Sequence, residues 1–473
     1  MKKFLNDRCI VDDDGVFHYD SDSEITPSDL YRFIQHNEFL SMQYAKYRRY
    51  YKANHDLILK AKPKPNGKPD NRLVLNYPKK LVDTFTGFAV GKPVQITLQE
   101  DLANKTLSEF NLSRKMDSVF ARVWKESSIY GRAYFYVYGS DGEVYVTDAT
   151  PLDTFVIYDN TVAFKPLYAV RYTQKGQAQA YKVTLYSNDY VWQYNTNNGS
   201  RSFGQREKNP FGMIPIVEAV ENDERLGVIE NVITLINEMD KAMSEKSNDV
   251  DYFADAYMKV LGAILTPEQL EKLRDTRIIN LKSKESEDDT PETLDVDFLS
   301  KPNADTTQEN LLNRIEDELY KMAMIVNLND ESFGNSTGIA LEMKYKPMLN
   351  LATLKSRIFN ESIKDMYRVV FASDLLQGIE RETWKFLDIN YQYDLPHDSL
   401  TEAQTAQALA SLGISTETWL KTLSAVNDPR QEKENMDREQ QERISSNLDF
   451  IKQNNGVTDG ELNDDSQGRE TAD

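Results

Sequence analysis

The sequence predicts an α+β fold, because helical and strand patterns occupy separate blocks of the chain. Apolar residues recur three and four positions apart in residues 27–60 and again after residue 225, as they do in amphipathic helices. Residues 131–222 alternate aromatic or β-branched residues with small or polar ones, which is typical of strands. A small mixed segment at 257–302 lies between two of the later helices. A chain of 473 residues can supply two or three such domains.

In the N-terminal half, the predicted helix of residues 27–60 begins behind a candidate N-cap in "TPSD". It is followed by "KAKPKPNGKPDNR" (60–72), a basic linker whose prolines are incompatible with a continued helix. Helical periodicity returns at 76–90 and 103–130. The segment "GRAYFYVYGSDGEVYVTDA" then predicts a β-hairpin that turns at "GSDG", and strand patterns continue to about residue 222.

In the C-terminal half, residues 225–250 and 305–326 predict two amphipathic helices. Between them lie the helical stretch "TPEQLEKLRDTR" and the strand-like runs "YMKVLGAIL", "IINLK" and "LDVDFL". A glycine-punctuated loop, "FGNSTG", leads into a long helical pattern that ends near Gln377. Shorter helices are predicted within 401–446, and the acidic, polar tail is expected to be disordered.

Composition limits the possible functions. The formal charge of −20 and the pI of about 4.8 exclude a protein that binds phosphates over its whole surface. Cys9 is the single cysteine and has no intrachain disulfide partner, which fits a reducing cytoplasm. The N-terminus lacks the apolar core of a signal peptide, and no uncharged apolar run approaches the ~18 residues that span a bilayer. We expect a soluble intracellular product with no membrane partner.

No catalytic, metal-binding or cofactor motif is complete in this sequence. The loop "GNSTGIAL" has the first spacing of a phosphate-binding loop, but Ile339 and Ala340 stand where a lysine and a hydroxyl residue are needed. The acidic run at 285–297 lacks the ordered spacing and central glycine of a calcium loop. We therefore predict a chain that is not an enzyme and that needs no metal or cofactor. The four histidines form no H-x-x-x-H pair and are expected to be surface or half-buried side chains: His18, His36, His55 and His397.

One segment combines tyrosines with basic residues and has two interpretations. In "SMQYAKYRRYYKANHD" the tyrosines alternate with cations, which is the composition of a nucleic-acid-binding patch. The same pattern is also produced by an amphipathic helix that packs its tyrosines against neighbouring elements. We favour the packing interpretation. The cations are Lys46, Arg48, Arg49 and Lys52.

The order of the blocks, together with several quoted stretches, resembles the portal proteins of tailed bacteriophages of the long-tailed, siphophage type. The resemblance spans some 300 residues and weakens beyond about residue 390. The matching stretches, in order, are "YYKANHDLI", "DNRLVLNYPKKLVDTFTGFAVGKPVQI", "NPFGMIPIVEAVEND", "NDVDYFADAYMKVLG", "LEKLRDTRIINLK", "VDFLSKP" and "FGNSTGIALEMKY".

The resemblance implies a ring at one capsid vertex, usually of twelve subunits, through whose channel double-stranded DNA enters and leaves. Each subunit of this fold has regions known as wing, stem, clip and crown, and a long kinked helix. The implied segments are an N-terminal arm (1–26), the wing (27–224), a stem helix (225–256), the clip (257–302), a second stem helix (303–327), a channel loop (328–338), the long kinked helix of the wing (339–377), the crown (378–446) and a disordered acidic tail (447–473). Without the resemblance, residues 257–302 would be interpreted as an ordinary subdomain of a monomer.

The resemblance also implies partners and a place in the virion. ATP hydrolysis would belong to a packaging motor, the large terminase subunit, which docks on the clip. A head-completion or adaptor protein would follow it there, and major capsid and scaffolding proteins would surround the ring, which is assembled in the host cytoplasm. The strand-like runs of the clip are too short to close a core alone, so we expect strand pairing between neighbouring subunits. The clip residues expected at partner contacts are Arg274, Arg277, Ile278, Ile279 and Phe298.

The loop and helix of "FGNSTGIALEMKYKP" are the candidate channel site. Gly334 and Gly338 give the loop conformational freedom, and the polar residues between them can bond to passing phosphates without a fixed charge. A helix of about 40 residues, roughly 60 Å long, should follow, with a kink at Pro347. The alternative is a surface loop that joins two packed helices. The residues expected at the DNA are Asn335, Ser336, Thr337, Lys344 and Lys346.

Further basic residues along this helix have two interpretations. They would supply local positive charge in a ring of acidic subunits, or they would lie on a solvated face or in salt bridges between subunits. These residues are Lys355, Arg357, Lys364 and Arg368.

Two other functions remain possible at this stage. A different ring component, such as a head-to-tail adaptor, is disfavoured by the size of the chain and by the α/β insertion between long helices. A carboxylate-based hydrolase could take its acids from "DVDF", but paired acids without a visible site are common surface features.

Overall fold

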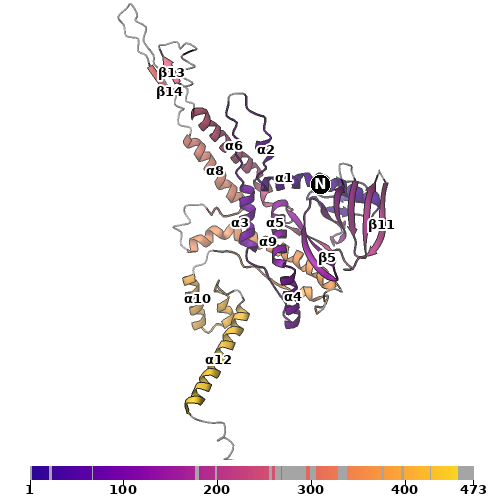
Figure 1. The fold of residues 1–473 in the computed structure, drawn as a ribbon, viewed down its shortest axis with the longest axis vertical. Coiled ribbons are helices and arrows are strands. Elements are labelled where there is room, and N and C mark those ends of the chain that lie inside the picture. Colours follow the sequence, from indigo (N-terminus) through magenta and orange to yellow (C-terminus); the bar gives the residue numbers. More distant parts are fainter. Residues whose placement is uncertain are drawn as a thin grey trace, which may run out of the picture. The chain divides into compact units, whose positions relative to one another are not determined.

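The computed structural model describes residues 3–20, 24–65, 68–175, 180–197, 200–254, 258–261, 268, 295–298, 305–328, 338–373, 376, 378–395, 399–426 and 428–455. The chain divides into two compact units. Unit 1 comprises residues 1–331 and 344–394, and unit 2 comprises residues 332–343 and 395–473. Helices and strands are mixed along the chain, which confirms the predicted α+β class (Figure 1).

The largest β structure of unit 1 is an eight-stranded sheet with the order β1-β2-β3-β7-β8-β9-β10-β11. The three N-terminal strands were not predicted: they add to the sheet through a parallel pairing of β3 with β7, whereas the other neighbours pair antiparallel. The strands are β1 (Lys3–Phe4), β2 (Cys9–Val11), β3 (Phe17–Tyr19), β7 (Thr154–Asp159), β8 (Pro166–Lys175), β9 (Ala180–Tyr186), β10 (Tyr190–Asn197) and β11 (Ser200–Lys208).

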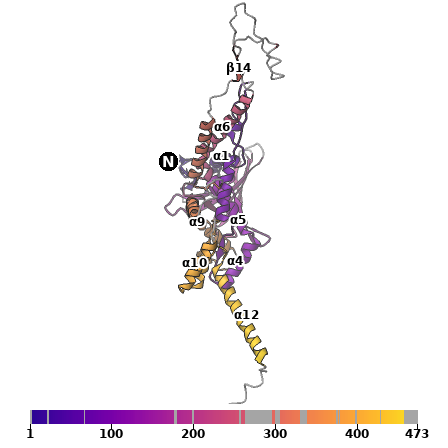
Figure 2. The ribbon, with the colours of Figure 1, turned by 90° about the vertical axis from the view of Figure 1, so that its left-hand side faces the viewer.

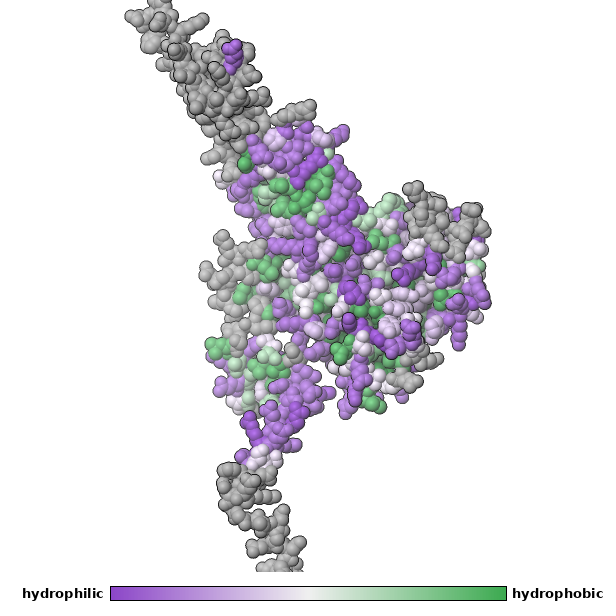
Figure 3. All heavy atoms as spheres, in the orientation of Figure 1, coloured by the Kyte–Doolittle hydropathy of each residue, from purple (hydrophilic) through white to green (hydrophobic). Residues whose placement is uncertain are grey.

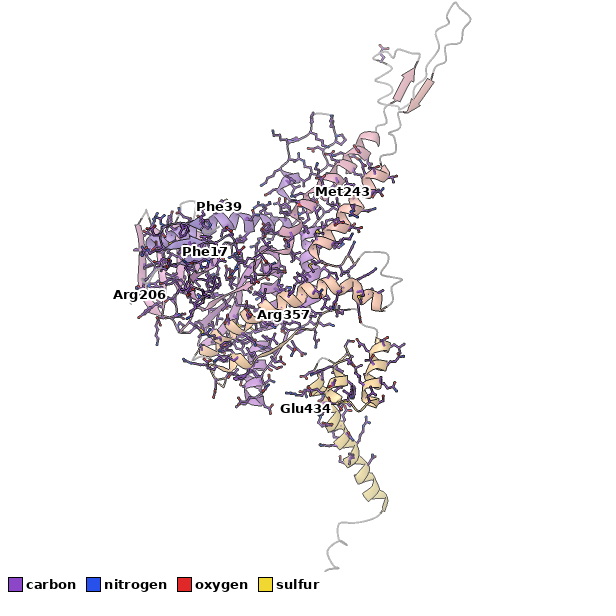
Figure 4. All side chains as sticks on the ribbon, turned by 180° about the vertical axis from the view of Figure 1, so that it is seen from behind. Phe17, Phe39, Arg206, Met243, Arg357 and Glu434 are labelled. Atoms are coloured by element: carbon purple, nitrogen blue, oxygen red, sulfur yellow. The ribbon has the colours of Figure 1, made fainter. Side chains whose placement is uncertain are left out.

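Helix α1 (Pro27–Tyr51) supplies the apolar cover for this sheet. Thr26 caps the helix, because its hydroxyl accepts a hydrogen bond from the amide of Asp29 at 3.2 Å. Phe33 is fully buried and meets Phe17 of the sheet edge-on, with ring centroids 5.6 Å apart. Phe17 is labelled in Figure 4. The helix predicted across 27–60 is interrupted after Tyr51, and α2 (Asp56–Leu59) follows as a separate short helix.

A second sheet has the order β12-β5-β6. Strands β5 (Arg132–Ser140) and β6 (Glu143–Ala149) form the predicted hairpin, and β12 (Ile216–Val220) pairs with the other side of β5. Asp141 and Gly142, both at positive φ, make the two-residue turn. One helix, α5 (Met116–Tyr130), packs on one face of this sheet. Two further helices precede it in sequence, α3 (Tyr77–Val90) and α4 (Asp101–Ser113), and both contact α5.

Two long helices, α6 (Val228–Ala254) and α8 (Asp305–Ala323), lie side by side in unit 1 (Figure 2). The chain between them contains two short antiparallel strands, β13 (Met258–Leu261) and β14 (Asp295–Phe298), in which Met258 lies opposite Phe298. The strands occur in two of the three runs predicted for the clip. The third run, "IINLK", is outside the described residues.

Helix α9 (Gly338–Ala372) is the longest helix of the chain as described. Beyond it, η2 (Thr383–Phe386) leads to β15 (Asp388–Asn390), which pairs with β4 (Gln95–Thr97). Residues 378–394, the first part of the predicted crown, therefore belong to unit 1.

Unit 2 contains α10 (Ser399–Ser411), α11 (Thr416–Leu420) and α12 (Pro429–Asn455). Helix α12 includes the first residues of the predicted acidic tail. Hydrophilic side chains cover most of the surface in the view of Figure 3, and apolar ones form separate areas. Among the described residues, no helix is both long and apolar enough to cross a membrane.

Candidate functional site

The two predicted stem helices, α6 and α8, pack directly against each other. Met239 of α6 is buried together with Leu312 and Ile315 of α8. Farther along the pair, the ammonium of Lys246 forms an ion pair with the carboxylate of Glu309. Amphipathic periodicity produces this pairing, because each helix has one apolar stripe that it must bury. The two helices therefore form a hairpin-like arm that carries β13 and β14 between them in sequence.

A second side of α6 is polar and holds residues 71–75, which we call the strap. Alternate backbone amides of the strap donate hydrogen bonds to side chains that lie one helical turn apart on α6. We call these three bonds the ladder. They are Leu75 to Asp240 at 2.8 Å, Leu73 to Ser244 at 2.9 Å and Asn71 to Asn248 at 2.6 Å.

Asp240 also binds the imidazole of His55, which lies between α1 and α2. The Nε2 atom of His55 is 3.1 Å from the carbonyl oxygen of Tyr50, which can only accept, so Nε2 carries a proton. The Nδ1 atom faces the Asp240 carboxylate, and the imidazole ring stacks on the Tyr50 ring with centroids 4.5 Å apart. His55 is fully buried and His18 is buried at 6% exposure, so the expectation of surface or half-buried histidines is wrong for both residues. The buried imidazole ring of His55 contacts both the carbonyl oxygen of Tyr50 and the carboxylate of Asp240, and it thereby attaches α6 to the end of α1.

The tyrosines of the "SMQYAKYRRYYKANHD" segment pack as the favoured interpretation required. Tyr44, Tyr47 and Tyr50 are buried on α1. The hydroxyl of Tyr50 donates to Asn237 of α6 at 2.7 Å. This segment is thus a structural contact with α6, and the buried rings of Tyr44, Tyr47 and Tyr50 are not available to stack on bases.

Most of the clip residues expected at partner contacts lie outside the described residues. Arg274, Arg277, Ile278 and Ile279 belong to this group. Phe298 is the last residue of β14, and only its backbone pairing is described. The clip assignments therefore stay predictions.

The candidate channel residues divide in the same way. Asn335, Ser336 and Thr337 are outside the described residues, whereas Lys344 and Lys346 lie in the first turns of α9. Lys346 is exposed and Lys344 is half-buried. The helix continues through Pro347, and the predicted kink at that residue stays a prediction.

Helix α9 has one exposed and one buried stripe, each with steps of three and four residues. Lys346, Arg357 and Arg368 are on the exposed stripe; Arg357 is labelled in Figure 4. Lys355 is on the buried stripe, which excludes it from contact with DNA. The sequence contained this signal, because residue 355 continues the apolar series Met348, Ala352, Phe359, Ile363, Met366 and Val370.

The side chain of Lys355 is enclosed by elements of the sheet and α5. Its ammonium donates to the carbonyl oxygen of Trp124 at 3.0 Å and to the hydroxyl of Ser128 at 2.8 Å, and it pairs with the carboxylate of Glu221. It also lies 4.2 Å from the ring centroid of Trp124, a cation–π contact. Burial lowers the pKa of Lys355 to about 8, against the opposing effect of Glu221. Lys355 thus fixes α9 to α5 and to the end of β12.

The family model described as "Phage portal protein, SPP1 Gp6-like" matches residues 32–446, so the chain belongs to that family and the resemblance seen in the sequence is confirmed. One curated relative, the portal protein of Bacillus phage SPP1, is 26% identical over 332 residues. The match covers 64% of this chain and 62% of that relative, so the chain spans less than two thirds of its length.

Solved structures that the chain resembles come from the necks of gene transfer agent particles. One, from the neck of an empty GTA particle, matches at 12% identity and a TM-score of 0.43, over 78% of this chain and 89% of that one. Another, from the neck of a native GTA particle computed with C12 symmetry, has 12% identity and a TM-score of 0.41, over 72% and 85% of the two chains.

Proposed function

We propose that this chain is the subunit of a portal ring, usually of twelve copies, at one vertex of a phage capsid. Double-stranded DNA would pass through the ring during packaging and ejection. The observation that carries the proposal is the family match over residues 32–446, which includes both stem helices and the whole of α9. The ring is a conduit and not a catalyst, and it would be assembled in the host cytoplasm before it becomes part of the virion.

In this proposal the arm of α6 and α8 is the stem, and the segment between these helices is the clip. The clip would bind the large terminase subunit during packaging and a head-completion or adaptor protein afterwards. Major capsid and scaffolding proteins would contact the outside of the ring. The direct packing of α6 on α8 supports the stem assignment, because an inserted module needs two adjacent helices to carry it.

The first turns of α9 and residues 328–338 are the proposed channel contact. Lys346 supports this choice, because it is exposed on the same stripe as Arg357 and Arg368. The chain as a whole carries a charge of −20, and on the exposed stripe of α9 the cations alternate with the carboxylates of Glu361 and Asp365. Binding that is weak per subunit suits a duplex that must slide, since each added phosphate contact tightens binding.

The mass of the native particle tests the proposal. We expect a ring near twelve times 54.5 kDa by native mass spectrometry. A monomer at all concentrations would contradict it, and so would a ring that never associates with capsids.

A crosslinking experiment tests the channel contact. Cys9 is replaced by alanine, a single cysteine is placed at Lys346, and the matched control carries the cysteine at Asp101, an exposed position of α4. With DNA stalled during packaging, an adduct is expected at 346 and not at 101. Adducts at neither site, while both cysteines react with a soluble thiol reagent, would reject the channel assignment.

A further inference from the structure

Two of the places where the chain passes between its units are held at one side chain, Phe88 of α3. The chain leaves unit 1 after residue 331, returns to it at Lys344 and leaves it again after Asp394. Tyr345 follows the second of these crossings, and Tyr393 comes just before the third. The rings of Tyr345 and Tyr393 both contact the Phe88 ring, with centroids 6.0 Å and 5.6 Å from it. We call these three rings the Phe88 junction.

The Phe88 junction is buried at its centre and bonded on one side through the backbone. Phe88 is 4% exposed and lies near the C-terminal end of α3. The Tyr393 ring stacks on it at an interplanar angle of 10°, and the amide of Asp394 donates to the carbonyl oxygen of Phe88 at 3.0 Å. Burial raises the pKa of Tyr345, and the charge of the Asp394 carboxylate raises it further. The residues at the two crossings are therefore close enough to influence each other.

The first turns of α9 have a weaker backbone connection to the rest of that helix, because of Pro347. Proline has no amide, so the carbonyl oxygen of Met343 receives no helical hydrogen bond from residue 347. Residues 338–346 are therefore joined to the remainder of α9 by fewer backbone bonds than a continuous helix provides. The contact between Tyr345 and Phe88 lies on the N-terminal side of this missing bond, where side-chain contacts matter most.

We propose that the Phe88 junction couples the start of α9 to the connection that leads to α10, so that loosening of either one loosens the other. The physical reason is a shared partner. If Tyr393 is removed, Phe88 loses a packed neighbour and can shift, and its contact with Tyr345 weakens. Coupling of this kind acts equally in both directions. Lys346 follows Tyr345, so a contact at Lys346 in the ring would act on the connection to α10; this use of the coupling rests on the proposed function, whereas the coupling itself does not.

Hydrogen exchange in the full chain tests the coupling, measured by mass spectrometry with resolution of single amides. Tyr393→Leu removes one ring from the junction and leaves the sequence of α9 unchanged. We expect the amides of residues 344–346 to exchange at least about threefold faster in this variant, because aromatic pairs contribute stability beyond the area that they bury. In the reverse direction, Tyr345→Leu should accelerate exchange of the Asp394 amide by a similar factor. Unchanged exchange at either position would overturn the proposal.

A conservative variant separates the ring of Tyr393 from its hydroxyl, which donates to Ser356 of α9 at 3.1 Å. Tyr393→Phe keeps the ring and removes that bond, so exchange at residues 344–346 should stay within about twofold of the wild type. The matched control is Tyr138→Leu, because Tyr138 of β5 is also half-buried and stacked on another tyrosine. It should leave residues 344–346 unchanged. Acceleration in Tyr393→Phe equal to that in Tyr393→Leu would assign the effect to Ser356, and acceleration in Tyr138→Leu would indicate a general loss of stability; either result would overturn the proposal.

The variant Phe88→Leu tests whether the effect passes through Phe88. In a Phe88→Leu chain, the further change Tyr393→Leu should accelerate exchange at residues 344–346 by less than about twofold. A further acceleration as large as in the wild-type background would show that the coupling bypasses Phe88, and it would overturn the proposal. If the far-UV circular dichroism of Phe88→Leu shows that it does not fold, the comparison of Tyr393→Leu with Tyr393→Phe decides. These measurements need no ring, so a chain that forms none would remove the proposed function and leave the test of the junction intact.

Discussion

The ammonium of Lys355 and the carboxylate of Glu221 form an ion pair in which only 1% and 3% of the two side chains are exposed. One partner lies on α9, and the other directly follows β12. Taking two charges out of water costs several kcal/mol per ion, so a pair of this kind contributes little net stability unless its geometry is good. Its contacts with Trp124 and Ser128 give it one permitted arrangement. We infer that the pair selects the position of α9 on α5 more than it stabilises the fold.

Removal of one charged partner should therefore lower the free energy of unfolding more than removal of both. Lys355→Met leaves the Glu221 carboxylate buried without its cation and should cost about 3–5 kcal/mol. The double variant Lys355→Met/Glu221→Leu should recover most of that loss. Chemical denaturation of the two variants and of Glu221→Leu gives the double-mutant cycle. Equal losses in the single and double variants would contradict the interpretation.

The same lysine predicts a pH dependence. Its pKa is about 8 in the folded protein, below the ordinary value of 10.5. Between these two values the lysine is neutral in the folded chain and charged in the unfolded one, so unfolding takes up a proton and becomes harder as pH rises. The Tm of the wild type minus that of Lys355→Met should thus increase from pH 7.5 to pH 9.5. The difference from the variant removes the contribution of tyrosines, and a flat or falling difference would oppose the prediction.

The ladder on α6 predicts a local effect that global stability does not reveal. Ser244→Ala removes the acceptor for the Leu73 amide, a hydrogen bond that contributes about 1 kcal/mol. Hydrogen exchange at Leu73 should therefore accelerate about fivefold. The matched control is Ser108→Ala on the exposed side of α4, which should leave Leu73 unchanged. Unchanged exchange at Leu73 in Ser244→Ala would show that the strap is held by other contacts.

Two glycines at positive φ predict losses of very different size for the same substitution. Gly131, at φ +82°, ends α5, and a Cβ built on it would lie 1.8 Å from the carbonyl oxygen of Arg225, just before α6. Gly142, at φ +77°, is in the hairpin turn and has open space around it. Gly142→Ala should cost about 1–2 kcal/mol from backbone strain alone. Gly131→Ala should cost several kcal/mol more, measured as the fall in Tm, because two backbones must separate. Similar Tm values would contradict the close approach.

The sequence predicts local structure well where one signal decides it. The N-cap at Thr26 and the hairpin turn at Asp141 and Gly142 depend on a few neighbouring residues, and both are present. The strand β3 depends on a parallel pairing with β7, and its three residues are too few to produce a period. Non-local pairing of short strands leaves no local pattern, so the N-terminal strands were not predictable in this way.

In the candidate site, too, the sequence predicts the features that have a local signal and misses those that depend on distant partners. Hydrophobic periodicity predicted the helices α6, α8 and α9, because long amphipathic helices have a strong period. The roles of Lys355 and His55 were misjudged from their chemistry, since charged or titratable residues are expected at the surface. Their burial depends on partners more than a hundred residues away in sequence, Glu221 and Asp240. The position of residue 355 within the buried stripe was the one available local signal.

The strap and α6 run in opposite directions with almost the same repeat. Two residues of extended chain advance about 6.6 Å, and four residues of an α-helix advance about 6.0 Å. Three bonds can therefore stay aligned while the offset grows to about 1.2 Å, and a fourth would be farther out of register. The next alternate residue of the strap is Pro69, which has no amide to donate. Because the two rises nearly match over only three bonds, the strap can bind α6 in one register, and the distances between successive donors and successive acceptors set that register. An insertion before Pro69 should leave the three bonds intact, whereas one added residue within 71–75 should move the donating amides on one side of the insertion out of register with their acceptors on α6.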